Sequence, residues 1–222
     1  MERPRVVIVI PAFNEASTIT AVVGSVSAHG LAVVVDDGST DSTAENARRA
    51  GADVVVHARN QGYDGALNSG FARADALDCE FVVTCDADGQ HNPQQLGEFV
   101  RLLEEGYDLV LGVRDRQQRV GERLFALAAR RLWGVSDPLC GMKAYRMSLY
   151  RKIGRFDTFG SIGTELAVRS IARGAKTIER KTVIRDRADA PRFGRRLAAN
   201  IRILRALVIL VSLGLVGRLA AA

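Results

Sequence analysis

The chain has 222 residues, 47% hydrophobic and 25% charged, and this composition excludes a disordered, collagen-like or disulfide-scaffold protein. The length suits one medium-sized domain with a short appendage. No stretch holds the roughly 18–20 uninterrupted apolar residues of a membrane span, and the first residues lack the pattern of a signal peptide.

The two halves of the chain carry opposite charge. Residues 1–111 hold 7 basic and 17 acidic side chains, whereas residues 112–222 hold 24 basic and 8 acidic ones. The acidic half suits a cation, and the basic half suits phosphates or an anionic lipid surface. A solvated mixed surface is the plainer alternative. The three cysteines, Cys79, Cys85 and Cys140, form neither a disulfide framework nor a zinc pattern, which favours a reducing cytosolic compartment.

Short apolar runs alternate with helical patterns through the first half. The expected strands cover residues 6–10, 31–35, 54–57, 81–85 and 109–113. The expected helices run from Ser17 or Thr18 to residue 28, from a capping box of Ser42 and Glu45 to Gly51, from residue 62 to about 76, and from Pro93 to about 105. This alternation predicts an α/β fold with a mostly parallel sheet and helices on both faces.

The second half is less regular. We expect helices over residues 122–133 and from about 164 to 173, strands near 143–145 and over 177–184, and a basic loop over 185–196. The tail, residues 197–222, forms a further expected unit, an apolar and basic C-terminal helix after a main domain of residues 1–196. Its apolar run of 12 residues, 206–217, reaches roughly 18 Å as a helix. Membrane contact, docking on its own domain and an oligomer contact remain open for it.

Polar residues follow the expected strands, where ligands bind in open α/β sheets. The segment Asp86-Ala87-Asp88-Gly89-Gln90-His91 offers two carboxylates and an amide oxygen, which are ligands suited to Mg²⁺ or Mn²⁺. The alternative is a polar turn. Two further segments are Asp36-Asp37-Gly38-Ser39-Thr40-Asp41 and Pro11-Ala12-Phe13-Asn14-Glu15. Their acids suit a nucleoside, but the plainer interpretation is helix capping and first-turn charge.

Together with Asn60-Gln61-Gly62-Tyr63 and Asp137-Pro138-Leu139-Cys140-Gly141-Met142-Lys143, these segments occur in a specific order. Over about residues 5–195, the chain resembles the family 2 glycosyltransferases of the GT-A fold. Within that family it is most similar to the branch of dolichyl- or polyprenyl-phosphate sugar synthases.

The resemblance implies a role for each matching residue. Pro11, Ala12, Glu15 and Asp37 would hold the nucleoside, and Arg114 would lie near the nucleotide. Asp86, Asp88 and Gln90 would bind Mg²⁺ or Mn²⁺ on the donor diphosphate. Asp137 and Lys143 fall in the acceptor segment; turn formation is the alternative for Asp137 and surface charge the alternative for Lys143. Arg187 and Arg192 would close on the phosphates, and contact with anionic lipid is the alternative for this pair. Asp137 and Glu165 are the candidate bases, although first-turn charge also explains Glu165.

The resemblance therefore implies an inverting, metal-dependent glycosyltransferase. It would move a sugar from a UDP- or GDP-sugar to a polyprenyl phosphate at the cytoplasmic face of a membrane, and a homo-oligomer is one further expected partner state. A saccharide or glycolipid hydroxyl is the alternative acceptor, and it requires a base such as Asp137 or Glu165. A basic nucleic-acid-binding module is disfavoured by the complete acidic set and by the 6% aromatic content. A nucleotidyltransferase would need a glycine-rich basic phosphate loop, which the start of the chain lacks.

Overall fold

The computed structural model describes residues 3–89, 92–115, 119–182 and 196–219. Within them, one sheet contains seven strands in the order β3-β2-β1-β4-β6-β5-β7. The strands are β1 (Val6–Ala12), β2 (Leu31–Asp36), β3 (Asp53–Val56), β4 (Phe81–Thr84), β5 (Leu109–Arg114), β6 (Lys143–Arg146) and β7 (Thr177–Thr182). Only β6 runs antiparallel to its neighbours, β4 and β5. The expected mostly parallel α/β sheet is therefore confirmed.

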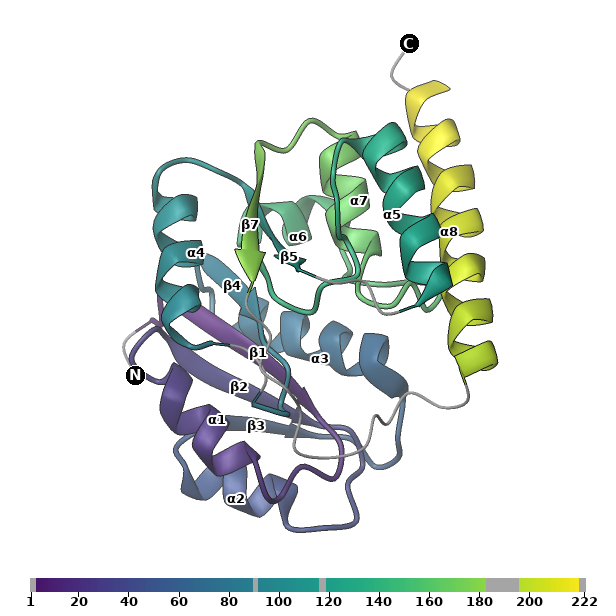
Figure 1. Cartoon of the computed structure of the whole chain (residues 1–222). Coiled ribbons are helices and arrows are strands. Elements are labelled where there is room, and N and C mark those ends of the chain that lie inside the picture. Colours follow the sequence, from purple (N-terminus) through teal and green to yellow (C-terminus); the bar gives the residue numbers. More distant parts are fainter. Residues whose placement is uncertain (1–2, 90–91, 116–118, 183–195, 220–222) are drawn as a thin grey trace.

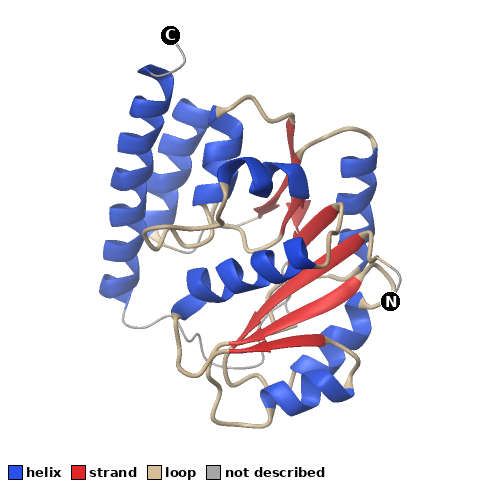
Figure 2. Ribbon diagram, turned by 180° about the vertical axis from the view of Figure 1, so that it is seen from behind, coloured by secondary structure: helices blue, strands red, loops and turns tan. Residues whose placement is uncertain are grey.

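Helices cover both faces of this sheet (Figure 1). They are α1 (Ile19–Val26), α2 (Thr43–Arg49), α3 (Gly62–Ala76), α4 (Gln94–Glu104), α5 (Val120–Trp133), α6 (Met147–Ile153), α7 (Glu165–Ala172) and α8 (Arg196–Leu219). Figure 2 shows α3 lying across the strands on the face opposite α1 and α2. The expected helices are present, and α6 is an additional one.

Alternating side chains of β1 build two separate cores. Ile8 and Ile10 join a cluster with apolar residues of α1 and α4. Val7 and Val9 point to the other face and join a cluster with residues of α3, α5, α7 and α8. Because β1 is buried on both faces, its sequence is a continuous apolar run rather than an alternating one.

The predicted capping box at α2 is wrong. Ser42 is the N-cap residue, but its side chain makes no capping hydrogen bond. Asp41 replaces it, because its Oδ1 accepts a hydrogen bond from the amide of Thr43 at 3.0 Å. A charged acceptor on the preceding residue satisfies the helix start better than a neutral hydroxyl.

The C-terminal helix α8 is not the apolar helix expected from the sequence. Ala199, Ile203, Ala206 and Leu210 are buried and face α5 and α7, against which α8 packs. Arg202 and Arg205 lie on the same helix and are exposed. Among the described residues, none of the helices combines the length and apolarity that crossing a bilayer demands.

Candidate active site

A cavity of about 740 Å³ lies at the carboxyl ends of β1, β2 and β4. Its walls come from residues 11–13 and Glu15, from Asp37, from residues 60–66 at the start of α3, from residues 86–88, and from Asp157, Gly160, Ile162, Arg202 and Arg205. Parallel strands end at one edge of a sheet, which is why segments far apart in the chain meet here.

Six residues singled out from the sequence line this cavity together: Pro11, Ala12, Glu15, Asp37, Asp86 and Asp88. Arg114, Asp137, Lys143 and Glu165 are not among the lining residues. Gln90, Arg187 and Arg192 lie outside the described residues.

Asp37 organises the turn before α3. One carboxylate oxygen, Oδ1, accepts a hydrogen bond from the amide of Gln61 at 2.8 Å and contacts His57 Nδ1 at 2.7 Å. The other oxygen accepts a hydrogen bond from the amide of Gly62, also at 2.8 Å. The Asp37 side chain therefore joins β2 to the turn that forms one wall of the cavity, besides facing the cavity itself.

Glu15 is held in a similar way at the end of β1. It is 7% exposed, its amide donates a hydrogen bond to Thr43 Oγ1 at 2.8 Å, and its carboxylate accepts one from Thr18 Oγ1 at 3.1 Å. These contacts fix the position of its carboxylate in the cavity wall.

Asp86 lies against a glycine of the 137–143 segment. A Cβ atom added at Gly141 would lie 2.4 Å from Oδ2 of Asp86. The hydroxyl of Tyr63 lies 3.4 Å from Oδ1 and donates to it. Burial, followed by the negative charge of Asp86, raises the pKa of Tyr63 well above its ordinary value, so the phenol keeps its proton as a donor.

Asp86 and Asp88 fit the binding of a divalent ion. Both carboxylates line the same cavity, and hard oxygen ligands of this kind suit Mg²⁺ or Mn²⁺, which usually keeps waters and substrate phosphates as further ligands. In the part of the chain that the structure describes, no group of three or more acidic, histidine or cysteine side chains is arranged to hold a metal.

Asp137 and Arg114 form a largely buried ion pair outside the cavity lining. Asp137 is 2% exposed, and its two oxygens accept hydrogen bonds from Arg114 Nε at 2.8 Å and Nη2 at 2.9 Å. Burial opposes the charge of Arg114, but the hydrogen bonds and attraction of Asp137 outweigh it and raise the pKa of Arg114. Roles for these two residues at the nucleotide or as a base remain predictions.

Lys143 and Glu165 are also buried. The Lys143 side chain, on β6, donates a hydrogen bond to the carbonyl of Cys140, and burial lowers its pKa. Glu165 contacts Arg169 at 2.7 Å and accepts hydrogen bonds from the amide and hydroxyl of Thr158. Glu165 thus anchors the loop between α6 and α7, and its role as a base remains a prediction.

Sequence reasoning missed four charged lining residues: Asp64, Asp157, Arg202 and Arg205. Asp64 accepts hydrogen bonds from the amides of Ile162 and Gly163. Burial, followed by the nearby charge of Asp157, raises its pKa to about 6. The 157–163 segment carries no recognisable motif, and only the tertiary structure shows that α8 lies beside the cavity. The available signal was the spacing of Arg202 and Arg205, which places both on one side of a helix.

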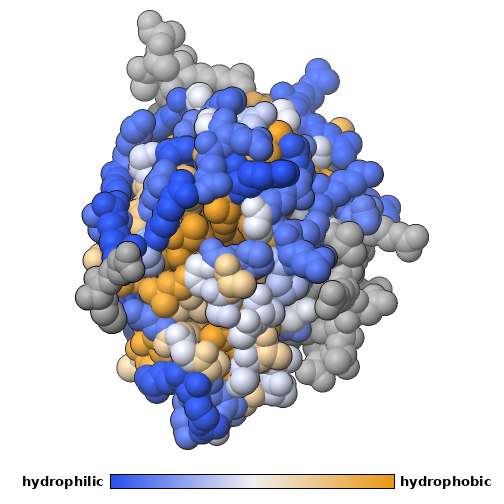
Figure 3. Space-filling model, turned by 90° about the vertical axis from the view of Figure 1, so that its left-hand side faces the viewer, coloured by the Kyte–Doolittle hydropathy of each residue, from blue (hydrophilic) through white to orange (hydrophobic). Residues whose placement is uncertain are grey.

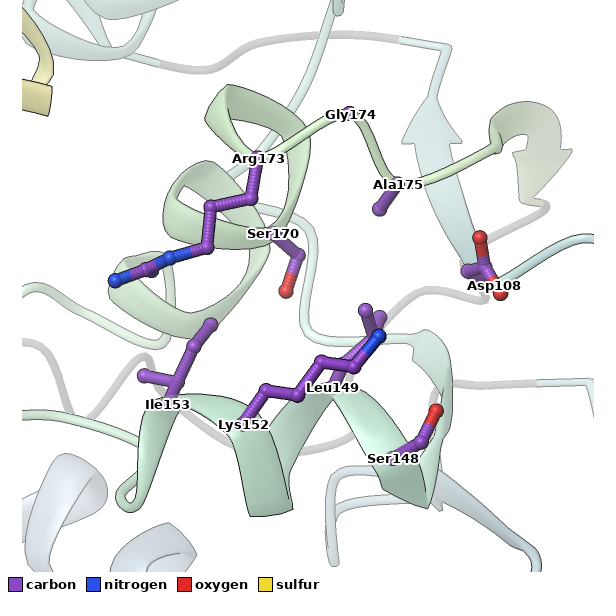
Figure 4. Close-up of a pocket in the computed structure, with 9 residues that line it drawn as sticks. All are labelled: Asp108, Ser148, Leu149, Lys152, Ile153, Ser170, Arg173, Gly174 and Ala175. Atoms are coloured by element: carbon purple, nitrogen blue, oxygen red, sulfur yellow. The ribbon is translucent and has the colours of Figure 1, made fainter. Parts of the chain in front are cut away.

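Two other cavities are smaller. One, of about 280 Å³, lies beside α1 and shares Asp86 with the main cavity. Figure 3 looks onto the α1 and α4 side, where an apolar band crosses the surface between hydrophilic areas. The other, of about 130 Å³, lies between α6, the end of α7 and the start of β5 (Figure 4). There Lys152 lies across the cavity while the Arg173 guanidinium points away from it, so its charged groups do not converge.

Comparisons with known proteins agree on one family. The family model described as glycosyl transferase family 2 matches residues 7–154. A dolichyl-phosphate hexose transferase of Haloferax volcanii is 34% identical over 82% of this chain and 83% of its own length. An undecaprenyl-phosphate 4-deoxy-4-formamido-L-arabinose transferase of Pseudomonas syringae is 34% identical over 64% of this chain, which spans only 47% of that protein.

A solved structure has the same architecture. The glucosyl-3-phosphoglycerate synthase of Mycobacterium tuberculosis, in complex with Mg²⁺ and uridine diphosphate, superposes with a TM-score of 0.75 at 27% identity. The match covers 92% of this chain and 78% of that one. The strand-end cavity described above therefore belongs to a fold for which a metal–nucleotide complex is known.

Proposed function

The chain belongs to glycosyl transferase family 2 and is a glycosyltransferase, and we propose that it transfers a sugar from a nucleoside diphosphate sugar to a polyprenyl phosphate at a membrane surface. Two relatives carry names that specify dolichyl or undecaprenyl phosphate. These names support a lipid phosphate acceptor, and the UDP complex of the similar synthase supports a uridine nucleotide donor.

One observation carries the proposal. Six residues that the sequence assigns to the donor site come from three strand ends and line a single cavity of about 740 Å³. Ligand pockets of roughly 300–1,000 Å³ are typical for small molecules, so the cavity suits a nucleotide sugar.

A divalent ion bound by Asp86 and Asp88, with Gln90 as the expected third ligand, would neutralise the diphosphate as it leaves. Protein residues would fix the rest of the donor: residues 11–12 and the turn held by Asp37 would enclose the nucleoside. The acceptor phosphate would attack the anomeric carbon from the side opposite the departing nucleoside diphosphate, so that a single displacement inverts that carbon.

A phosphate acceptor is already an anion at neutral pH, and it needs positioning rather than deprotonation. This agrees with the places of Asp137 and Glu165, which are 2% and 1% exposed and are held in ion pairs outside the cavity lining. In this mechanism both residues support the structure around the site.

Two neighbouring helices offer a surface for the membrane. Val120, Leu124 and Leu127 form an exposed apolar stripe on α5, and Ile201, Leu204 and Val208 form another on α8. The two helices pack side by side (Figure 1), so we treat these six residues as one apolar face. Exposed arginines 123, 130 and 131 lie on α5 and would attract anionic lipids. We propose peripheral binding at the cytoplasmic leaflet; a homo-oligomer contact is the other use for this face.

The alternative acceptor is a hydroxyl of a saccharide or small metabolite. The name of the structurally similar glucosyl-3-phosphoglycerate synthase favours it. A hydroxyl must lose its proton during attack, and Asp64, whose pKa is raised to about 6, is a carboxylate in the cavity wall able to accept it.

The test is a transfer assay with purified protein, vesicles that contain a polyprenyl phosphate, and a panel of UDP- and GDP-sugars with Mn²⁺ or Mg²⁺. Released nucleoside diphosphate and the mass of the lipid product are measured together. The proposal predicts an equimolar polyprenyl phosphosugar of inverted configuration, and loss of both signals with EDTA. Nucleoside diphosphate release that requires a hydroxyl acceptor, with no lipid product, would favour the alternative.

A further inference from the structure

Two arginines of α8 face the donor cavity. Arg202 and Arg205 lie three residues apart, so both side chains leave one side of the helix, and both line the cavity that contains Asp86 and Asp88. Arg205 also borders the α6–α7 loop, since a Cβ atom added at Gly160 would lie 4.0 Å from its Nη1. The remaining charged residues in the cavity lining are acids: Glu15, Asp37, Asp64, Asp86, Asp88 and Asp157.

Several of these acids already have partners. Asp37 accepts hydrogen bonds from the amides of Gln61 and Gly62, Asp64 from those of Ile162 and Gly163, and Asp157 from those of Gly160 and Ser161. The carboxylates of these three residues therefore stabilise the backbone of the neighbouring loops.

The arginines are used differently. Over residues 3–89, 92–115, 119–182 and 196–219, no ion pair joins Arg202 or Arg205 to a carboxylate. Two guanidinium groups that face a cavity without an acidic partner are suited to a ligand with negative charge, because guanidinium binds phosphate oxygens through two parallel hydrogen bonds.

The position of the arginines around α8 indicates which anion they would meet. At about 100° per residue, Ile203, Ala206 and Leu210 form the buried side and Ile201, Leu204 and Val208 the exposed apolar side. Arg202 and Arg205 fall between these two sides. A ligand on the apolar face would thus meet the arginines where that face borders the cavity.

We propose that Arg202 and Arg205 bind the phosphate of the acceptor lipid, whose hydrocarbon chain lies along the apolar face of α5 and α8. This inference rests on the proposed function and adds two residues to which the proposed function gives no role. A second phosphate beside the donor diphosphate meets strong repulsion in a partly buried site, and the two guanidinium groups offset it. Apolar contact and phosphate recognition then come from a single helix.

Binding of geranyl phosphate tests this directly, because its short chain avoids the need for a membrane. Calorimetry would measure its affinity for the protein saturated with Mn²⁺ and UDP. The double variant R202Q/R205Q should bind it at least about tenfold more weakly, while R202K/R205K retains part of the affinity. The control is R48Q/R49Q, which removes the same two positive charges from exposed residues of α2 and should leave the affinity unchanged.

Two further measurements separate the other uses of these arginines. The affinity for UDP with Mn²⁺ should be the same in R202Q/R205Q and the wild-type chain; a loss there with unchanged geranyl phosphate binding would assign the arginines to the donor and overturn the inference. Loss of binding to phosphatidylglycerol vesicles, again with unchanged geranyl phosphate binding, would assign them to bulk lipid and equally overturn it.

The inference and the proposed function fail in different ways. If the wild-type chain does not bind geranyl phosphate, or the variant binds it equally well, the arginine assignment is wrong whichever acceptor is used. If only the wild-type chain binds it but the transfer assay gives no lipid product, the anion site stands and the choice of acceptor in the proposed function is wrong.

Discussion

Gly141 and Asp86 approach so closely that a side chain on the first would displace the second. A Cβ atom at position 141 would lie 2.4 Å from Oδ2 of Asp86 and 2.9 Å from Oδ1. The 137–143 segment thereby restricts the position of the carboxylate that we propose to bind the metal.

Gly141→Ala should therefore weaken nucleotide binding in the presence of Mn²⁺, because Asp86 must move by a distance that metal ligation does not tolerate. Calorimetry with UDP or GDP would measure the loss, which we expect to be at least about tenfold. The matched control is Gly24→Ala in α1, where an added Cβ meets nothing within 4 Å. Equal nucleotide affinity in the two variants would contradict this role of Gly141.

Asp137→Asn should destabilise the fold. The change removes the nearer of two carboxylates beside the Arg114 guanidinium, which is 20% exposed, and leaves only Glu122 at 4.0 Å. Loss of one partner of a buried pair costs about 3–5 kcal/mol, and urea unfolding would measure it. Glu45→Gln breaks an exposed pair with Arg49 and should cost less than about 1 kcal/mol. Unchanged stability of Asp137→Asn together with lost turnover would instead identify Asp137 as the catalytic base.

The two sides of α8 should respond differently to substitution. Val208→Gln changes an exposed residue of the apolar face, and Ile203→Ala shortens a residue that is 3% exposed. The first should reduce sedimentation with vesicles at unchanged stability, whereas the second should lower the free energy of unfolding by roughly 2–5 kcal/mol. Vesicle binding that is insensitive to Val208→Gln would argue against a membrane role for this face.

Asp64 should give the stability of the chain a specific pH dependence. Its pKa is about 6 in the folded chain against the ordinary 3.8, so the folded state holds an extra proton between these values. The contribution of Asp64 to stability is therefore fully present below about pH 4 and is lost as the pH rises through 6. Urea unfolding from pH 4.5 to 7.5 should show the wild-type chain losing stability relative to Asp64→Asn up to about pH 6.5 and no further change above it. A pH-independent difference would show that its pKa is ordinary.

The sequence predicts the helices and strands of both halves, with the exception of α6, but it does not predict how the elements of the second half pack. Residues 6–10 are apolar because β1 is buried on both faces. The acidic residues that follow the parallel strands lie together at the cavity because these strands end at the same edge of the sheet. Asp41 rather than Ser42 caps α2 because two short polar side chains compete for one amide. Such competition depends on the local backbone rather than on residue type.

The contacts of α8 illustrate the limits of local patterns. The apolar run after Arg205 predicts a helix, but its burial depends on which elements lie beside it. Asn200 accepts a hydrogen bond from the amide of Gly121 at the start of α5, and this contact joins segments 79 residues apart. A tertiary contact of this kind leaves no periodic pattern in the sequence. Only the structure therefore shows that Arg202 and Arg205 lie at the cavity.

The most direct measurement for the central claim is titration of UDP or GDP into the wild-type chain and Asp88→Asn, each with Mn²⁺ and with EDTA. We expect tight binding only in the wild-type chain with Mn²⁺, while circular dichroism shows that the variant keeps its fold. Nucleotide binding that is equally strong with EDTA, or in a folded Asp88→Asn variant, would contradict the claim that these strand-end acids hold a divalent ion on the donor diphosphate.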